Sequence, residues 1–271
     1  MTESRASSVP TPDRDLAALL EFAVGAALRA GEDTLRWFGR AVPIDTKVDG
    51  TPVSLADREA EARLRSLIRE RFPDDALLGE EEGTSGEAGA PWRWILDPID
   101  GTRSFVRGVP LYAVLVGVEF RGHPLLGVLH FPALGETLAA ARGQGCHANG
   151  VRCRASGVRH LRDAVALTSD PAITAQSPVA EGWSDLVARV DYSRTWGDAY
   201  GHAMVARGRA DIMLDPLDLK AWDAAPLLPV IEEAGGRFTD LNGEPTIHGG
   251  SGLSTNGLLH EEVLRVLNGK G

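Results

Sequence analysis

The stretch Trp92-Arg93-Trp94-Ile95-Leu96-Asp97-Pro98-Ile99-Asp100-Gly101-Thr102 decides how this chain is interpreted. Its first five residues have strand character, and Pro98 is expected to end the strand because it has no backbone N–H to donate. Two carboxylates three positions apart on a turned segment can converge on one point, as a hard divalent cation requires. Gly101 and Thr102 add a backbone N–H and a hydroxyl that suit a phosphate. The stretch predicts a metal-assisted phosphate site, with an ordinary surface turn as the alternative.

Composition narrows the class of protein. The chain has 271 residues, of which 43% are hydrophobic and 24% charged, so it can form one large or two modest globular domains. Its two cysteines offer no disulfide framework, which favours a reducing, cytoplasmic location. No apolar run approaches the roughly 20 residues of a membrane span, and the Ser/Thr/Pro-rich residues 1–12 are expected to be a flexible tail. The net charge of −10 argues against nucleic acid but is compatible with a phosphate ester, because bound cations can invert the charge of a site.

The segment before this stretch predicts two helices separated by a short strand. Thr11-Pro12 predicts the start of a helix that ends near Phe38, and residues 44–50 predict a short strand and an Asp-Gly turn. The segment Ser54-Leu55-Ala56-Asp57 has capping-box spacing and opens a second helix. Asp57 can therefore serve simply to close the helix end, and the sequence does not separate that role from catalysis.

A cluster of acids follows the second helix. Residues 74–79 are expected to form a short strand that leads into Glu80, Glu81 and Glu82. A charge run usually marks a solvated surface, but this one follows an apolar strand, where an active-site loop would also lie. The Gly/Ser/Ala-rich residues 83–91 are predicted to be a flexible loop.

The rest of the chain predicts a strand meander followed by a layered α/β half. Residues 143–150 are rich in turn formers and are expected to form a loop. This loop marks the expected boundary between an N-terminal half, 13–150, and a C-terminal half, 151–271. The expected strands cover 111–120, 125–131, 136–141, 165–168, 192–194, 210–214, 237–240 and 253–255. The expected helices cover a poorly patterned stretch to 190, then 198–206, 222–234 and 258–267.

Three signatures together resemble the inositol monophosphatase family. They are Gly79-Glu80-Glu81, the segment from Asp97 to Thr102, and Trp222-Asp223 followed by Glu233-Ala234-Gly235-Gly236. They stand in the family's order with similar spacing, and the likeness covers about residues 15–267. The resemblance implies a layered α-β-α-β-α sandwich and a Mg²⁺-dependent, lithium-sensitive phosphatase of small molecules that is generally a homodimer.

The resemblance also assigns roles to residues. Glu80, Asp97, Asp100 and Asp223 match the family's metal-binding carboxylates, and Ile99 matches the position that contributes a backbone carbonyl. Such a set would repel itself strongly without bound cations, and two or three Mg²⁺ ions per site are expected. Asp57 with Thr102 matches the pair that orients the attacking water for direct hydrolysis, and Glu80 is expected to be catalytic as well as a metal ligand.

The substrate pocket departs from the inositol-specific pattern. Asp198 replaces a hydroxyl residue and Pro216 replaces a glutamate, and an added carboxylate suits a substrate that carries an amine or imidazole cation. The segments 100–110, 194–198 and 254–260 most resemble the histidinol-phosphate phosphatase branch, which implies L-histidinol phosphate as the substrate. The resemblance gives this substrate-binding set: Glu80, Ile99, Asp100, Gly101, Thr102, Arg194, Asp198, Asp223 and Asn256.

Several alternatives stay open. Arg194 is expected at the phosphate end, whereas Asp198 could simply cap a helix and Asn256 could simply form a turn. His130, His202 and His248 lack metal-ligand spacing and are expected to be packing or surface residues. The alternative functions are an inositol-phosphate or broad nucleotide phosphatase, and a non-catalytic phosphate-binding module.

Overall fold

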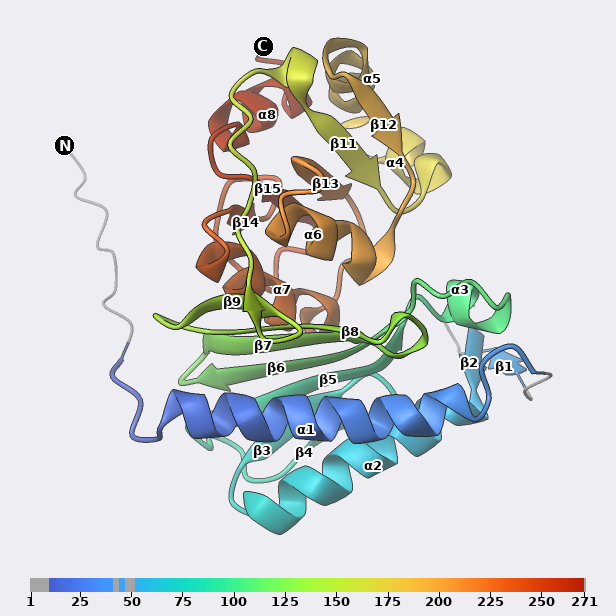
Figure 1. Ribbon diagram of the computed structural model, residues 1–271, viewed down its shortest axis with the longest axis vertical. Coiled ribbons are helices and arrows are strands. Elements are labelled where there is room, and N and C mark those ends of the chain that lie inside the picture. Colours follow the sequence, from blue (N-terminus) through green and yellow to red (C-terminus); the bar gives the residue numbers. More distant parts are fainter. Residues whose placement is uncertain (1–9, 41–43, 47–51, 271) are drawn as a thin grey trace.

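The computed structural model describes residues 10–40, 44–46 and 52–270, which form alternating layers of helices and sheets (Figure 1). Helices α1 (Leu16–Leu35) and α2 (Leu55–Arg71) cover one face of an eight-stranded sheet. Helices α6 (Asp198–Ala206) and α7 (Ala221–Glu233) lie between this sheet and a five-stranded sheet. The α-β-α-β-α sandwich that the resemblance implied is therefore confirmed.

The larger sheet is mixed, and its strand order is β10-β9-β8-β7-β6-β5-β3-β4. Among the described strands of this sheet, only the β3–β5 pair is parallel, while the neighbours from β5 to β10 form an antiparallel meander. Its strands are β3 (Ala76–Gly79), β4 (Gly83–Ser85), β5 (Trp92–Asp100), β6 (Ala113–Phe120), β7 (His123–Phe131), β8 (Glu136–Ala141), β9 (Gly145–Ala148) and β10 (Val151–Arg152). A separate antiparallel pair is formed by β1 (Ile44–Thr46) and β2 (Pro52–Ser54).

The smaller sheet has the order β12-β11-β13-β15-β14. Its outer face is covered by short helices, whose side chains share a core with β11 and β13. The strands are β11 (Val165–Thr168), β12 (Tyr192–Arg194), β13 (Ile212–Asp215), β14 (Arg237–Thr239) and β15 (Gly252–Thr255). The remaining helices are α3 (Thr102–Val106), α4 (Pro171–Gln176), α5 (Ala180–Arg189) and α8 (His260–Leu267), with single 3₁₀ turns at Pro132–Leu134 and Leu161–Asp163. The division of the chain near residue 150 stays a proposal.

Four local predictions were wrong, and long-range pairing explains three of them. The segments 83–91 and 143–150 contain β4 and β9, which pair with β3 and β8. Strand β5 continues past Pro98 to Asp100 because its register with β6 shifts between Asp97 and Asp100, so the missing N–H falls in the irregular part of the ladder. Helix α1 begins at Leu16 rather than at Pro12.

The earlier residue Asp15 is the better cap for α1. Its side chain accepts a hydrogen bond from the backbone N–H of Ala17 at 2.9 Å. The Asp49-Gly50 turn and the first nine residues of the expected tail lie outside the described residues. Within the part that the structure describes, no helix combines the length and the hydropathy needed to cross a bilayer.

Helix α7 packs closely on the larger sheet. Gly117 and Gly127 are opposite each other on β6 and β7, and α7 lies directly over them. A Cβ at Gly127 would lie 2.1 Å from the carbonyl oxygen of Pro226, and one at Gly117 would lie 2.7 Å from the Cβ of Ala225. Two glycines therefore let the helix backbone approach the sheet, and this approach fixes the position of Asp223 in the first turn of α7.

We expect Gly127→Ala to destabilise the protein by about 1–3 kcal/mol, because the new methyl group meets rigid helix backbone. Urea unfolding monitored by circular dichroism would measure the change. Gly25→Ala in α1 is the matched control, since a Cβ there has no atom within 4 Å and should slightly stabilise the helix. Equal unfolding midpoints for Gly127→Ala and the wild type would contradict this account of the packing.

Candidate active site

Three carboxylates from two distant segments meet at the end of β5. Oxygen atoms of Asp97, Asp100 and Asp223 all lie within 4.8 Å of one another. The irregular register around Pro98 turns the first two acids toward the same place. Asp223 stands in the first turn of α7, where its Oδ2 accepts a hydrogen bond from the backbone N–H of Lys220 at 2.7 Å. The expected convergence of these three acids is thus what the structure shows.

Glu80 lies beside this group but outside the set of oxygens within 4.8 Å. It follows β3, which runs parallel to β5, and its backbone N–H donates to the carbonyl of Leu96 at 3.2 Å. Its charge acts on both neighbouring acids, since it contributes to the raised pKa of Asp97 and to that of Asp223. The structure therefore places Glu80 within electrostatic range of the cluster.

The electrostatics of the cluster disfavour full ionisation. Burial raises the pKa of Asp97 well above its usual range, and the charges of Glu80 and Asp100 raise it further. Burial, followed by the charge of Asp198, likewise raises the pKa of Asp100. For Asp223, burial raises the pKa to about 7 against the opposing hydrogen bond from Lys220. These shifts have the sign expected of carboxylates that share one desolvated site.

Asp57 has one oxygen in a helix cap and one without a partner. Its Oδ2 accepts hydrogen bonds from the backbone N–H of Ser54 at 2.7 Å and from the Ser54 hydroxyl at 2.5 Å, so the predicted capping box is present. Its Oδ1 is buried and has no hydrogen-bond partner among the residues that the structure describes. Burial raises the pKa of Asp57, and the charge of Glu80 adds to the rise. The cap alone does not account for this side chain, because a buried acceptor without a donor is unfavourable.

The turn that follows β5 is shaped by hydrogen bonds among the motif residues. The backbone N–H of Ile99 donates to Oδ1 of Asp97 at 3.0 Å, and the Thr102 hydroxyl donates to the carbonyl of Ile99 at 3.2 Å. Gly101 precedes α3 with φ +78°, a conformation that favours glycine. A Cβ there would also lie 2.8 Å from Oδ2 of Asp198, so glycine admits the Asp198 carboxylate at this point.

The N-terminus of α6 is tied to the carboxylate cluster. The backbone N–H of Ala199 donates to Oδ2 of Asp100 at 2.7 Å, and that of Asp198 donates to the Ser169 hydroxyl at 2.8 Å. Gly197 occupies the cap position, so the capping role considered for Asp198 is wrong. Asp198 instead has φ +53°, an uncommon backbone conformation for a residue other than glycine. Its pKa is raised to about 6 by burial and then by the charge of Asp215.

A cavity of about 570 Å³ opens next to the carboxylates. Besides Asp100, Asp198 and Asp223, it is lined by residues that the sequence analysis did not select: Arg103, Ser104, Ser169, Asp170, His202, Asp215 and Asp218. Arg103 directly follows the central motif, which was an available signal. No local pattern singles out the remaining side chains, because they meet only in the folded chain.

His202 links this cavity to the smaller sheet. Its Nε2 lies 3.0 Å from Oδ2 of Asp215, and its Nδ1 lies 2.6 Å from the hydroxyl of Ser254. His202 is fully buried. Its contact with Asp215 holds that carboxylate at the cavity wall. The sequence interpretation of His202 as a packing residue omitted this contact.

Of the nine predicted substrate-binding residues, three line the cavity, namely Asp100, Asp198 and Asp223, and six do not, namely Glu80, Ile99, Gly101, Thr102, Arg194 and Asn256. Arg194 is exposed, donates to the carbonyl of Ser193 at 2.7 Å and stacks over the ring of Tyr192. Asn256 is buried, and its Oδ1 accepts from the backbone N–H groups of Leu258 and Leu259 at 3.1 Å each. The turn role considered for Asn256 is therefore present.

The donor set fits a hard divalent cation. Three carboxylates within 4.8 Å of one another, with Glu80 nearby, present only oxygen ligands, which Mg²⁺ and Ca²⁺ prefer. A bound cation would offset the repulsion that raises the pKa values of these acids. The unpartnered Oδ1 of Asp57 is a further acceptor for a water held at such a cation.

Known proteins share this architecture. The extragenic suppressor protein suhB of Bartonella henselae superposes with a TM-score of 0.86 at 31% identity, covering 92% of this chain and 98% of that one. The Thermotoga maritima IMPase gives a TM-score of 0.83 at 32% identity, covering 93% and 98%. A histidinol-phosphatase of Chlorobaculum parvum is 40% identical over 95% of this chain and 97% of its own. Fold, site and relatives together define a phosphoric monoester hydrolase.

The sequence matches one known protein family over almost the whole length of the chain. The pattern of the Inositol monophosphatase family matches residues 15–270. The chain belongs to this family. Another relative, a histidinol-phosphatase of Mycobacterium tuberculosis, is 42% identical over 92% of this chain and 97% of its own.

The raised pKa of Asp223 predicts how Mg²⁺ stabilisation depends on pH. Between its usual value of 3.8 and about 7, the metal-free folded protein binds a proton that the unfolded chain lacks. Protonation of Asp223 therefore stabilises the metal-free folded protein at low pH, and this contribution to the free energy of unfolding is lost as pH rises through 7. A bound cation offsets the cost of ionising Asp223 in the folded protein, so Mg²⁺ should raise the unfolding temperature more at pH 8 than at pH 5.5. Calorimetry with Mg²⁺ or a chelator measures both differences, and equal increments would contradict the prediction.

Proposed function

We propose that this protein is a Mg²⁺-dependent phosphatase that hydrolyses L-histidinol phosphate to L-histidinol and phosphate. Curated relatives that are 37% to 42% identical are named histidinol-phosphatase, which supports this substrate. The single structural observation that carries the proposal is the position of Asp198 and Asp215 in the wall of the cavity that adjoins the carboxylate cluster.

The charge of the cavity suits this substrate. Histidinol phosphate has a phosphate at one end and a primary amine and an imidazole at the other. With the phosphate at the cluster, the cationic end would face the cavity wall, where Asp198 and Asp215 provide negative charge. A neutral polyol can donate hydrogen bonds to these two carboxylates but has no positive charge to attract them.

The cluster residues would hold the metal. Glu80, Asp97, Asp100 and Asp223, with the carbonyl of Ile99, are the proposed ligands, and the number of ions follows the family expectation of two or three. Bound there, Mg²⁺ would supply neutralising charge to the phosphate oxygens and lower the pKa of a water molecule. The protein's own contribution is to keep these acids desolvated and fixed before the substrate arrives.

Asp57 and Thr102 are the proposed catalytic pair. The unpartnered Oδ1 of Asp57 can accept a hydrogen from the attacking water, while its Oδ2 stays bonded to Ser54 and holds the side chain in place. Thr102 begins α3 directly beside the cluster, so its hydroxyl can help to orient the same water. Gly101 would admit the phosphate close to the backbone. The reaction is then direct hydrolysis without a covalent intermediate.

An inositol-phosphate or broad phosphatase is the second candidate. It is favoured by relatives such as the fructose-1,6-bisphosphatase/inositol-1-monophosphatase of Aquifex aeolicus, which is 33% identical over 93% of this chain. Against it, Pro216 lines the cavity and offers no carboxylate to grip the hydroxyl groups of a polyol.

A panel of phosphate esters tests the substrate. With saturating Mg²⁺, phosphate release should give a higher kcat/KM for histidinol phosphate than for inositol 1-phosphate, fructose 1,6-bisphosphate or nucleotides. Asp97→Asn should lose the Mg²⁺-dependent release while retaining its circular dichroism spectrum, because the cluster then lacks one anionic ligand. Equal turnover of inositol phosphate and histidinol phosphate would defeat the narrow assignment.

Asp198→Asn separates specificity from chemistry. It removes one negative charge from the cavity wall, so kcat/KM for histidinol phosphate should fall about 10- to 100-fold, the range expected for losing a charged hydrogen bond. Turnover of a small ester without a cationic group, such as glycerol phosphate, should change much less, because Asp198 makes no charge–charge contact with it. A matched loss for both esters would show that Asp198 acts on the reaction rather than on recognition.

A further inference from the structure

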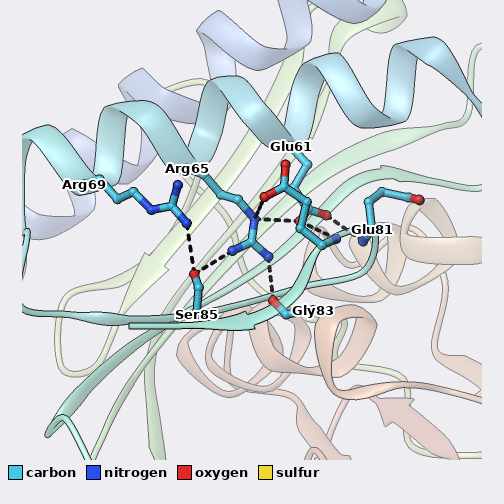
Figure 2. A network of polar contacts seen from close by, with 7 residues as sticks. Glu61, Arg65, Arg69, Glu81, Gly83 and Ser85 are labelled. Carbon is cyan, nitrogen blue, oxygen red and sulfur yellow. Dashed lines mark hydrogen bonds and ion pairs between the residues drawn. The ribbon is translucent and has the colours of Figure 1, made fainter. Parts of the chain in front are cut away.

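A buried ion pair on α2 binds the β3–β4 segment, which begins with Glu80 (Figure 2). Glu61 and Arg65 are 0% and 1% exposed, and Nε of Arg65 lies 2.7 Å from Oε1 of Glu61. Burying two charges costs desolvation energy that their attraction does not reliably recover. The pair is therefore poorly explained by stability alone, and its other contacts indicate what it does.

Both members of the pair bind the β3–β4 turn. The Glu61 carboxylate accepts the backbone N–H of Glu81 at 2.7 Å and that of Glu82 at 3.0 Å. Arg65 donates to the carbonyl of Gly83 at 2.5 Å and to the hydroxyl of Ser85 at 2.9 Å. The turn is thus held by side chains of α2 directly after Glu80.

Glycine at position 79 allows this approach. A Cβ there would lie 2.3 Å from Oε1 of Glu61 and 2.7 Å from Nη2 of Arg65. On its other side, the backbone N–H of Glu80 is bonded to the carbonyl of Leu96 on β5. The main chain at Glu80 is therefore fixed from α2 on one side and from β5 on the other.

The same helix face carries Asp57. Asp57, Glu61 and Arg65 are spaced by four residues, which places them along one side of α2. The proposed catalytic aspartate and the two side chains that hold the Glu80 turn therefore belong to one rigid helix. This arrangement couples the position of a proposed metal ligand to that of the acid that orients the water.

We propose that Glu61 and Arg65 are positioning residues for the metal site: they hold the Glu80 turn so that the Glu80 carboxylate faces the Asp97, Asp100 and Asp223 cluster. The inference rests on the proposed metal site. Residues that orient a ligand from behind typically contribute about 10- to 100-fold to metal affinity. The pair itself touches neither metal nor substrate.

Glu61→Gln is the direct test, with Glu59→Gln as its matched control. Gln replaces one acceptor oxygen by an amide, so it cannot accept all the donors that Glu61 binds. Glu59 lies on the same helix with its side chain exposed, where it accepts a hydrogen bond from Trp37. Calorimetric titration with Mn²⁺ should give a dissociation constant about 10- to 100-fold higher for Glu61→Gln and an unchanged one for Glu59→Gln.

A second variant keeps the inference testable where Glu61→Gln fails to fold. The double substitution Glu61→Met/Arg65→Met removes both charges at similar side-chain volume, a change that often preserves or raises stability. It should weaken Mn²⁺ binding as much as Glu61→Gln does, although its urea midpoint is retained. Weaker binding in a stably folded protein is a result that a merely structural role would not produce.

Kinetics supply an independent measurement. The Mg²⁺ concentration for half-maximal phosphate release should rise by the same factor as the dissociation constant, while kcat at saturating Mg²⁺ changes less. Wild-type Mn²⁺ affinity in Glu61→Gln or in the double variant would overturn the inference alone and leave the proposed function standing. Absence of Mn²⁺ binding to the wild type would overturn the metal site itself, and the inference with it.

Discussion

Mutual repulsion among buried carboxylates is the constraint on which the rest of this structure depends. Asp97, Asp100 and Asp223 present oxygens within 4.8 Å of one another, and burial and their neighbours raise the pKa of each. Such an arrangement is unfavourable in a metal-free chain, so the surrounding packing must hold it. It becomes favourable when cations bind, which is why a site of this kind can be both costly to form and selective for hard divalent ions.

The scaffold opposes this repulsion from several directions. The paired glycines Gly117 and Gly127 let α7 settle on the larger sheet and bring Asp223 to the end of β5. The N-terminus of α6 donates the N–H of Ala199 to Asp100. Helix α2 carries Asp57 and, through Glu61, binds the turn after Glu80. Each contact uses backbone or buried groups, so the positions of the acids are set before any ligand arrives.

The cavity is lined by several separate helices and strands, which explains how one fold can accept different esters. The phosphate end would meet residues contributed mainly by β5, α3 and α7, whereas another part of the wall comes from α6, the end of β13 and the segment after it. Asp198 and Asp215 stand in this second part of the wall, and His202 of α6 contacts Asp215 at the end of β13. Specificity can therefore change with a few side chains while the carboxylate cluster stays the same.

The local sequence determined those features of the protein that depend on residues close together in the chain. The turn chemistry after Leu96, the capping box at Ser54 and the acids of the short signatures are all encoded nearby, because a cap, a turn or a ligand pair needs only adjacent backbone. The tertiary structure alone decided that β4 and β9 are strands and that Arg194 stays outside the cavity. It also decided that Asp215 and His202 enter the site and that Glu61 and Arg65 hold the Glu80 turn. Those outcomes depend on segments far apart in the chain meeting in space, and neither local propensity nor spacing specifies which partners will meet.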